Sequence, residues 1–286
     1  MIRSLLYVPA SSSRFIAKAH QRGADAIILD LEDSVAPGEK EKARDGLAEA
    51  VPAVSQNGAT VFVRINSEKQ LLLADAEAAC RAGAFGLFVS KASEVSGLTR
   101  LARHLDKVEK SLKRKQKTMF VPLIESPGAV LDARTLAMAT PRVFGLIMGS
   151  EDLATAMGAQ PTPEFIRFPT LMVHFAAKAC GLLSFGFLLS QAEYSDVERI
   201  AKAAREARSF GFDGGTCVHP SAIPILNEAF SPSVTEIDRA KRMIAAFEES
   251  VSAGKGSCVF EGRMIDVAMV ARARGLLTKQ PVSKTP

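Results

Sequence analysis

The sequence predicts an α/β fold, a (β/α)8 TIM barrel followed by a C-terminal helical lid. Eight short apolar segments alternate along the chain with longer segments whose apolar residues recur every three to four positions. This alternation is typical of parallel strands joined by helices. Eight such units within about 225 residues match the size of a closed barrel, whereas open doubly wound sheets usually have fewer strands.

The eight expected strands follow one another at regular intervals. They are LLYVPA from Leu5, AIILDLED from Ala26, TVFVRIN from Thr60, GLFVSK from Gly86, TMFVPLIE from Thr118, VFGLIMGS from Val143, LLSFGFLLS from Leu182 and GTCVHP from Gly215. Among the helical segments, DVERIAKAAREARSFG carries Val197, Ile200 and Ala204 at helical spacing. Gly83 and Gly211 precede a strand, where glycine commonly ends a helix.

The chain is expected to divide into a barrel over residues 1–230 and a C-terminal helical extension over residues 231–286. In the extension, TEIDRAKRMIAAFEESVSA has the periodicity of one long helix, and VFEGRMIDVAMVARARGLL follows a glycine-rich break. From Thr278 onward the residues are polar and include proline, so we expect a frayed end. The extension exceeds what a barrel needs, which suggests a lid.

Composition excludes several classes of protein. The 36 basic and 31 acidic side chains leave a net charge of +5, which is too small to indicate a nucleic-acid or membrane surface. Trp is absent and Tyr occurs twice, so a base-stacking platform has little support. The four cysteines form no CxxC pair. The apolar run before Pro9 is too short for a signal peptide or a membrane span, and a cytoplasmic protein is predicted.

One stretch, from Arg100 to Lys117, is strongly basic, with eight basic and two acidic side chains. We interpret it as a solvated helix face rather than an anion-binding patch.

Charged side chains gather at the ends of the expected strands, where barrels of this type place their active sites. Those ends carry Asp30, Glu32 and Asp33 after strand two, Arg64 and Asn66 after strand three, Lys91 after strand four, Glu125 after strand five, Ser150, Glu151 and Asp152 after strand six, and His219 after strand eight. A partly buried charge is costly unless it is paired. So many charges at one mouth therefore indicate a reaction site.

Glu125 and Asp152 are the candidate metal ligands. They follow adjacent strands at the same end, so their carboxylates can converge on one ion and leave positions for water and substrate, as Mg²⁺ prefers. No His or Cys accompanies them, which favours Mg²⁺ over Zn²⁺. The alternative is that each carboxylate caps a helix or pairs with Arg64 or Lys91.

Arg64, Glu32 and Asp33 complete the candidate site. Arg64 could bind a substrate carboxylate or a developing oxyanion, or could form only a salt bridge at the rim. Glu32 and Asp33 could accept hydrogen bonds from metal-bound water, although Asp33 could also cap the following turn. His219 is interpreted as a hydrogen-bonded structural residue rather than a general base. No nucleophile elbow or phosphate-binding glycine loop occurs, which argues against hydrolases and nucleotide-binding proteins.

Several motifs occur together in this order in one enzyme family. They are LLYVPA, ADAIILDLEDSVAPGEKEKAR, VFVRIN, IESPGAV, GSEDLA, HPSAI with NEAFSPS, and EGRMID. On these motifs, the chain resembles the citrate lyase β-subunit-like proteins of the HpcH/HpaI aldolase/citrate lyase family. The resemblance implies a TIM barrel, usually a homotrimer, that uses Mg²⁺ to cleave or form a carbon–carbon bond beside a thioester such as citryl-CoA or malyl-CoA.

The resemblance also implies roles for single residues. Glu125 and Asp152 match the metal ligands, and Glu125 also contacts the substrate. Arg64 matches a substrate-binding arginine, and Glu32 with Asp33 match the acids around the metal-bound waters. Asp266 matches an acid that the C-terminal extension offers to the active site of a neighbouring subunit, where it would exchange a proton with the thioester fragment.

The chain departs from the family pattern at several places. Ala10 stands where Gly is common, Ser90 where Pro is common, and Gly215 where Lys is common. The seventh strand lacks the usual acidic residue and ends in Ser190 and Gln191. These departures predict a divergent substrate range.

We therefore expect a Mg²⁺-dependent carbon–carbon lyase that cleaves a 3-hydroxyacyl thioester into a 2-oxo acid or glyoxylate plus an acyl-CoA. Its partners would be these small molecules and further copies of the chain in a homo-oligomer, with a trimer favoured. Two alternatives stay open. One is thioesterase or malate synthase-like activity on the same centre, and the other is a non-catalytic metabolite-binding barrel.

Overall fold

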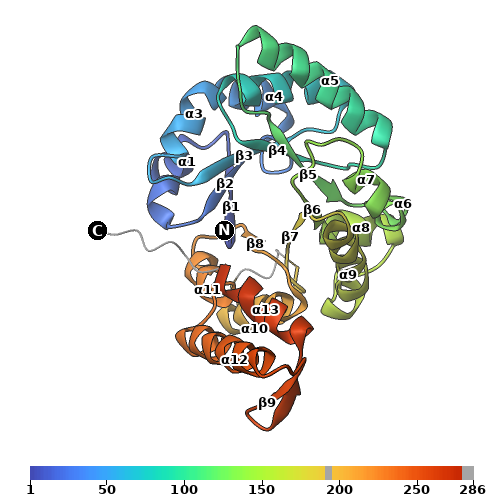
Figure 1. Ribbon diagram of the computed structural model, residues 1–286. Helices are drawn as coiled ribbons and strands as arrows, with labels where there is room; N and C mark the ends of the chain where they lie inside the picture. Colours follow the sequence, from blue (N-terminus) through green and yellow to red (C-terminus); the bar gives the residue numbers. More distant parts are fainter. Residues whose placement is uncertain (191–194, 279–286) are drawn as a thin grey trace. The chain divides into compact units, whose positions relative to one another are not determined.

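The computed structural model describes residues 1–190 and 195–278 (Figure 1). Gln191 and the residues after Thr278, which were expected to be frayed, lie outside the described residues. The chain forms two compact units, one of residues 2–227 and one of residues 228–286 together with Met1. The functions expected for them, a catalytic barrel and a lid, stay predictions.

Eight parallel strands form the sheet of the larger unit. They are β1 (Ser4–Pro9), β2 (Ala26–Asp30), β3 (Thr60–Ile65), β4 (Gly86–Val89), β5 (Met119–Ile124), β6 (Gly145–Met148), β7 (Leu183–Phe185) and β8 (Gly215–Cys217). Their order is β7-β6-β5-β4-β3-β2-β1-β8. A parallel bridge between Phe185 and Gly214 joins the two edges of this order. The predicted (β/α)8 barrel is confirmed.

Strand β7 is shorter than the sequence predicts. The apolar run was expected to continue to Ser190, but the strand ends at Phe185. The next residue, Gly186, has φ 119°, a backbone conformation outside the strand region that glycine adopts readily. The run LLSFGFLLS is therefore a short strand followed by a buried loop.

Helices separate the strands and cover the outside of the barrel (Figure 1). They are α1 (Ser13–Ala19), α2 (Lys40–Asp45), α3 (Leu47–Val54), α4 (Lys69–Arg81), α5 (Val95–Ser111), α6 (Pro127–Leu131), α7 (Ala133–Ala137), α8 (Ser150–Met157), α9 (Pro163–Ala179), α10 (Val197–Phe210) and α11 (Ala222–Ala229). Helix α10 shows how the sequence sets these limits. Asp196 accepts a hydrogen bond from the Arg199 amide at its start, and Gly211 ends it with φ 99°.

The barrel interior is filled by aromatic and aliphatic side chains. Phe62 and Phe88 are fully buried and meet edge to face, with ring centroids 5.3 Å apart. Phe185, on strand β7 at one end of the strand order, belongs to the same core cluster. The interior below the mouth is thus a packed core, as expected for this fold. In the described part of the chain, no helix has the length and apolar character that crossing a membrane requires.

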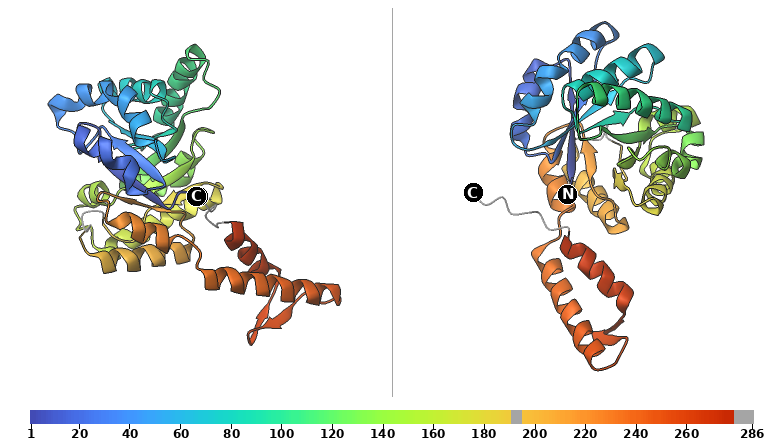
Figure 2. Two further views of the ribbon diagram at one scale, coloured as in Figure 1. Left: turned by 90° about the vertical axis from the view of Figure 1, so that its left-hand side faces the viewer. Right: turned by 45° about the horizontal axis from the view of Figure 1, so that its top comes forward.

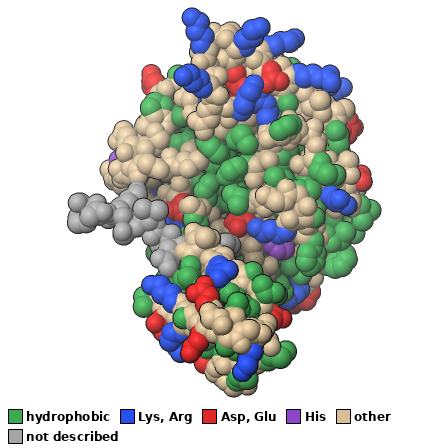
Figure 3. Space-filling model, in the orientation of Figure 1, with side chains coloured by type: hydrophobic (Ala, Val, Ile, Leu, Met, Phe, Trp, Pro, Cys, Tyr) green, Lys and Arg blue, Asp and Glu red, His purple; other side chains and the backbone are tan. Residues whose placement is uncertain are grey.

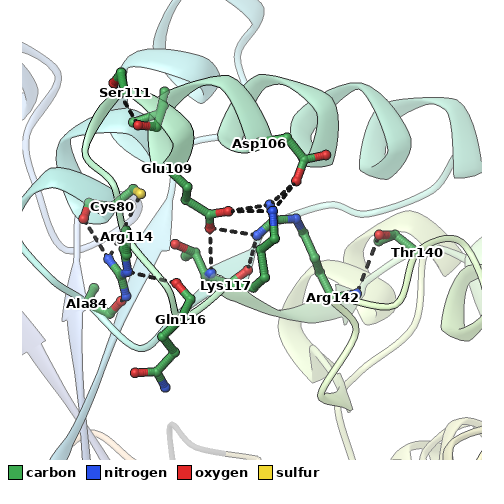
Figure 4. A network of polar contacts seen from close by, with 12 residues as sticks. Cys80, Ala84, Asp106, Glu109, Ser111, Arg114, Gln116, Lys117, Thr140 and Arg142 are labelled. Carbon is green, nitrogen blue, oxygen red and sulfur yellow. Dashed lines mark hydrogen bonds and ion pairs between the residues drawn. The ribbon is translucent and has the colours of Figure 1, made fainter.

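The basic stretch from Arg100 to Lys117 is mostly helix α5, and Lys and Arg side chains gather over it at the top of Figure 3. Its two acids are engaged in ion pairs (Figure 4). Glu109 is 1% exposed and accepts hydrogen bonds from the Arg142 guanidinium at 2.7 and 2.8 Å. Lys117 lies 2.7 Å from Asp106. The acids thus tie the helix to the barrel. Most of the basic residues are exposed, but Arg114 is half-buried and donates hydrogen bonds to the carbonyls of Cys80 and Ala84.

The smaller unit contains α12 (Val234–Ser252) and α13 (Val267–Thr278), which lie side by side (Figure 2). The sequence predicts a helical extension, but this unit is not wholly helical. Between the two helices, β9 (Cys258–Phe260) and β10 (Arg263–Ile265) form an antiparallel hairpin. Glu261 and Gly262 connect them with φ 49° and 75°, and two positive φ values are what a tight hairpin turn requires.

Candidate active site

The polar residues at the barrel mouth stand one layer above the apolar core. Alternate side chains of a strand point to the same side. Tyr7, Asp30, Arg64 and Glu125 follow the core residues Leu5, Ile28, Phe62 and Leu123, each by two positions. These four polar residues line a cavity of about 460 Å³, which also borders Asp33, Ser34, Gly149, Ser150, Glu151 and Asp152. Strand periodicity thus brings Arg64 and Glu125 to this cavity, and the loop after β2 and the start of α8 add the predicted residues Asp33 and Asp152.

Arg64 is held by three carboxylates. Its Nε and Nη2 donate to the two oxygens of Asp30, both at 2.7 Å, in a bidentate pair. Its Nη1 donates to Asp33 Oδ2 at 3.0 Å and lies 3.0 Å from Glu32 Oε2. The guanidinium also lies over the ring of Tyr7, with Cζ 5.0 Å from the centroid. The salt bridges considered as an alternative role for Arg64 are therefore present.

Asp30 organises the loop that carries Glu32 and Asp33, a role not predicted from the sequence. It accepts hydrogen bonds from the Glu32 amide at 2.9 Å, the Ser34 amide at 3.1 Å and the Ser34 hydroxyl. Burial alone would raise the pKa of Asp30, but the hydrogen bonds and charge of Arg64 outweigh it and hold that pKa below its ordinary value. Asp30 and Arg64 are direct partners in the β2–β3 register, which brings the two side chains together.

Glu32 is buried between two cations. Its Oε2 lies 3.0 Å from Arg64 Nη1, and its Oε1 lies 3.3 Å from Lys91 Nζ. Burial raises the pKa of Glu32, while Arg64 and Lys91 oppose that rise. For Glu32, pairing with Arg64 and Lys91 is therefore observed, and contact with a metal-bound water stays a prediction.

Glu125 is fixed through one carboxylate oxygen and leaves the other open. Its Oε2 accepts a hydrogen bond of 2.6 Å from the Lys91 amide. Lys91 has φ 52°, an unusual left-handed conformation for a lysine that turns its N–H toward Glu125. Burial raises the pKa of Glu125 to about 7; the Lys91 amide opposes this rise, and the charges of Asp152 and Glu32 add to it. A cation at this position would favour the ionised form.

Gly149 makes room for the Glu125 side chain. A Cβ atom at this residue would lie 2.5 Å from Glu125 Cγ and 2.6 Å from Oε1, closer than non-bonded atoms approach. The backbone of Gly149 is not in a glycine-only region, with φ −94°. Its small size, rather than its flexibility, therefore matters at the cavity wall.

Asp152 lies in the first turn of α8 and is half-buried. Within the described residues it makes no hydrogen bond and no ion pair, and Glu125 Oε1 likewise accepts no hydrogen bond. No three His, Cys, Asp or Glu side chains of the described ranges are grouped so as to hold a metal ion. Two open carboxylates suit Mg²⁺, a hard cation that keeps several waters in its shell. The donor set fits the predicted ion.

Two departures from the family pattern involve the segment that follows β7. A Cβ atom at Gly215 would lie 2.8 Å from Phe187 Cδ1, so the bulky residue after β7 occupies the space that a side chain at 215 would need. Ser190, near the end of the run that lacks the usual acid, donates a hydrogen bond to the carboxylate of Glu151. Helix α8 thus supplies an acid to this side of the cavity.

Asp266 and His219 do not belong to the cavity lining. Asp266 lies in the smaller unit, is exposed, and accepts hydrogen bonds from the amides of Ala268 and Met269 at the start of α13. Its role toward a neighbouring subunit stays a prediction. His219 Nδ1 lies 2.7 Å from the Ser221 hydroxyl, a contact of the structural kind expected for it.

Comparisons with known proteins agree with this architecture. The model of the HpcH/HpaI aldolase/citrate lyase family matches residues 3–220. A (3S)-malyl-CoA thioesterase of Cereibacter sphaeroides is 33% identical over 97% of this chain and 94% of its own length. The citrate lyase subunit beta of Haemophilus influenzae is 30% identical over 97% and 96%. The structure of protein CitE from Mycobacterium tuberculosis with magnesium, acetoacetate and coenzyme A has a TM-score of 0.80 and 28% identity, covering 96% of this chain and 97% of that one. The chain belongs to the HpcH/HpaI aldolase/citrate lyase family and is a citrate lyase β-subunit-like enzyme of the lyase class.

Proposed function

We propose that the protein is a Mg²⁺-dependent carbon–carbon lyase that cleaves a 3-hydroxyacyl thioester, such as citryl-CoA or malyl-CoA, into a 2-oxo acid or glyoxylate plus an acyl-CoA. One observation carries the proposal: Glu125, Asp152 and Arg64 line a single cavity of about 460 Å³. Two carboxylates for a cation and a guanidinium for an anion are what a hydroxy acid substrate requires. The relative crystallised with magnesium, acetoacetate and coenzyme A supports the same chemistry.

The residues at the cavity would bind the metal, bind the substrate and orient water. Glu125 and Asp152 would hold Mg²⁺, which when bound acts as a Lewis acid on substrate oxygens. Arg64, with Asp30 and Glu32 fixing its plane, would bind a carboxylate or carbonyl oxygen of the substrate and stabilise negative charge there. Asp33 and Glu32 would orient water at the edge of the cavity.

Cleavage of the substrate also requires a group that supplies a proton to the thioester fragment. The bond between the carbinol carbon and the carbon next to the thioester breaks, the hydroxyl loses its proton as it becomes a carbonyl, and the thioester fragment takes up a proton. We assign this last transfer to Asp266 of a neighbouring subunit. Donation between subunits makes assembly part of the reaction.

Self-assembly, with a trimer favoured, has support on the barrel surface. Helix α9 exposes Phe168 by 71% and Phe175 by 68%, and Leu131 of the neighbouring α6 by 76%. Apolar side chains gather over these helices on the right of Figure 3. Grouped large apolar side chains on a surface mark interaction sites. Light scattering of the purified chain tests the assembly, and a monomer at all concentrations would contradict it.

The direct test of the activity is product analysis. Purified protein with Mg²⁺ is given a panel of hydroxyacyl-CoA esters, and both fragments are identified by mass spectrometry. The proposal predicts equal amounts of acyl-CoA and of an oxo acid or glyoxylate, with loss of both in Glu125→Gln and Asp152→Asn. Substrate loss without either fragment would contradict it.

A thioesterase is the second candidate, and the 33% identity to a (3S)-malyl-CoA thioesterase favours it. The same panel separates the two activities. Hydrolysis releases free CoA and the intact hydroxy acid, whereas carbon–carbon cleavage leaves the thioester in place. Malate synthase-like activity would be tested in the condensation direction. Acetyl-CoA and glyoxylate would be supplied, and the release of free CoA would be measured.

A non-catalytic metabolite-binding barrel, the other alternative left open by the sequence, is not proposed, because the chain belongs to a family of lyases.

A further inference from the structure

Tyr7 lines the cavity, and its hydroxyl has no hydrogen-bond partner among the residues that the structure describes. It is one of two tyrosines in the chain and is half-buried at the inner side of β1. Its ring lies under the Arg64 guanidinium and meets the edge of Phe88, with centroids 6.2 Å apart. Its hydroxyl makes no hydrogen bond with any of residues 1–190 or 195–278. Tyr7 also lines the cavity, so this hydroxyl is available to a ligand.

The neighbouring arginine has few donors left for a substrate. A guanidinium has five N–H groups. In Arg64, three of them donate to Asp30 and Asp33, and Nη1 also lies 3.0 Å from Glu32. At most two N–H groups remain for an anionic ligand. A carboxylate offers about four lone-pair positions, so a second donor beside Arg64 is needed to satisfy it.

Other hydroxyls of the cavity are less well placed. The Ser34 hydroxyl already donates to Asp30. Ser150 lies at the start of α8, two residues before the proposed metal ligand Asp152. Tyr7 is the hydroxyl-bearing residue that contacts the guanidinium itself.

We infer that the Tyr7 hydroxyl is a substrate-binding hydrogen-bond donor that acts beside Arg64 and selects ligands with an anionic oxygen, a carboxylate of a 2-oxo or hydroxy acid, at this side of the cavity. The inference rests on the proposed function and adds a specificity-determining residue to it. The ring has a separate, positioning role, because it supports the guanidinium from below.

The protonation state agrees with this role. Burial raises the pKa of Tyr7, and the positive charge of Arg64 only partly opposes that rise. The hydroxyl therefore keeps its proton at neutral pH and can donate it in a hydrogen bond.

Two substitutions separate the hydroxyl from the ring. Tyr7→Phe removes the hydroxyl and retains the stacking on Arg64 and the edge contact with Phe88, whereas Tyr7→Leu removes both. Calorimetry would measure the binding of Mg²⁺ alone and then of pyruvate and oxaloacetate in the presence of Mg²⁺, on the full chain. We expect Mg²⁺ binding to be unchanged in Tyr7→Phe and 2-oxo acid binding to weaken about 10-fold, the loss of one hydrogen bond to a charged group.

The outcomes are distinguishable. If Tyr7→Phe binds both 2-oxo acids within about twofold of wild type and only Tyr7→Leu is impaired, the tyrosine merely supports Arg64 and the inference is wrong. If the wild-type protein shows no Mg²⁺-dependent binding of either acid, the proposed function fails, and the inference falls with it. Weaker binding in Tyr7→Phe with unchanged Mg²⁺ affinity supports both.

Discussion

Replacing Gly149 by alanine should disable the site with one methyl group. The added Cβ atom would lie 2.5 Å from Glu125 Cγ and 2.6 Å from Oε1. Carbon atoms in contact prefer about 3.5–4.0 Å, so the Glu125 side chain must retreat by about 1 Å. It cannot do so freely, because its other oxygen is held by the Lys91 amide at 2.6 Å.

The displacement sets the size of the effect. A shift of about 1 Å in a catalytic group can cost about 100-fold in rate. Crowding a packed site typically costs about 1–3 kcal/mol of stability, well short of unfolding most domains. We therefore expect Gly149→Ala to fold, to lose about 100-fold in kcat, and to bind Mg²⁺ at least about 10-fold more weakly.

A matched control lies three residues beyond Glu125. A Cβ atom at Gly128 in α6 meets nothing within 4 Å, so Gly128→Ala should leave activity and Mg²⁺ binding unchanged. The assays are steady-state kinetics, calorimetry with Mg²⁺ and thermal unfolding. Wild-type kcat and Mg²⁺ affinity in Gly149→Ala would refute the view that the position of Glu125 controls the site.

Three further outcomes test other parts of the structure. Glu109→Gln should lower the free energy of unfolding at pH 7 by about 1.5–3 kcal/mol, as expected for a lost hydrogen bond to a charged group. Burial opposes ionisation of Glu109, but Arg142 and the Thr118 amide lower its pKa to about 2 from 4.5. The stabilisation is therefore present above pH 4.5 and declines as the pH falls toward 2, so urea unfolding at pH 3.5 should show a smaller difference than at pH 7; an equal difference would contradict the ion pair. Arg64→Lys keeps the charge but not the bidentate fork to Asp30, and we expect a raised KM for the acid substrate, whereas unchanged kinetics would exclude Arg64 as the anion site. Asp266→Asn and Asp266→Ala should both lose turnover while retaining Mg²⁺ binding, and only the alanine should lose the α13 cap, worth about 1 kcal/mol. Mixing Asp266→Ala with Arg64→Ala should restore some activity, and failure to do so would place the action of Asp266 within one chain.

The barrel could be predicted from the sequence because its signal is local. Each strand is a short apolar run, and the polar residue that follows it marks the mouth. Strand periodicity alone carries Arg64 and Glu125 to the same layer, since each stands two positions after a core residue. This is why Arg64 and Glu125 could be selected from the sequence.

The supporting contacts depend on pairing between distant segments and could not be predicted in the same way. The Asp30–Arg64 pair requires the register of β2 on β3, which the sequence does not state. The left-handed backbone of Lys91 is set by its surroundings, because lysine itself disfavours φ 52°. The crowding of Gly149 becomes visible only when the position of the Glu125 side chain is known.

The hairpin β9–β10 could not be predicted from the sequence for a different reason. Its strands have three residues each, too few for a clear alternation of polar and apolar positions. Its turn uses Glu261 at φ 49°, a residue type that does not mark such a turn. For these reasons the sequence predicts a helical extension that includes the residues of this hairpin, and this part of the prediction is wrong.

We propose that Glu125 and Asp152 hold the Mg²⁺ that carbon–carbon cleavage of a hydroxyacyl thioester requires. The most direct measurement follows both fragments of malyl-CoA and citryl-CoA by mass spectrometry, with Mg²⁺ and with chelator, in wild type, Glu125→Gln and Asp152→Asn. We expect paired release of an acyl-CoA and its oxo acid or glyoxylate only in the wild type with Mg²⁺. Equal cleavage in the presence of chelator or in either variant, or release of free CoA with an intact hydroxy acid, would contradict it.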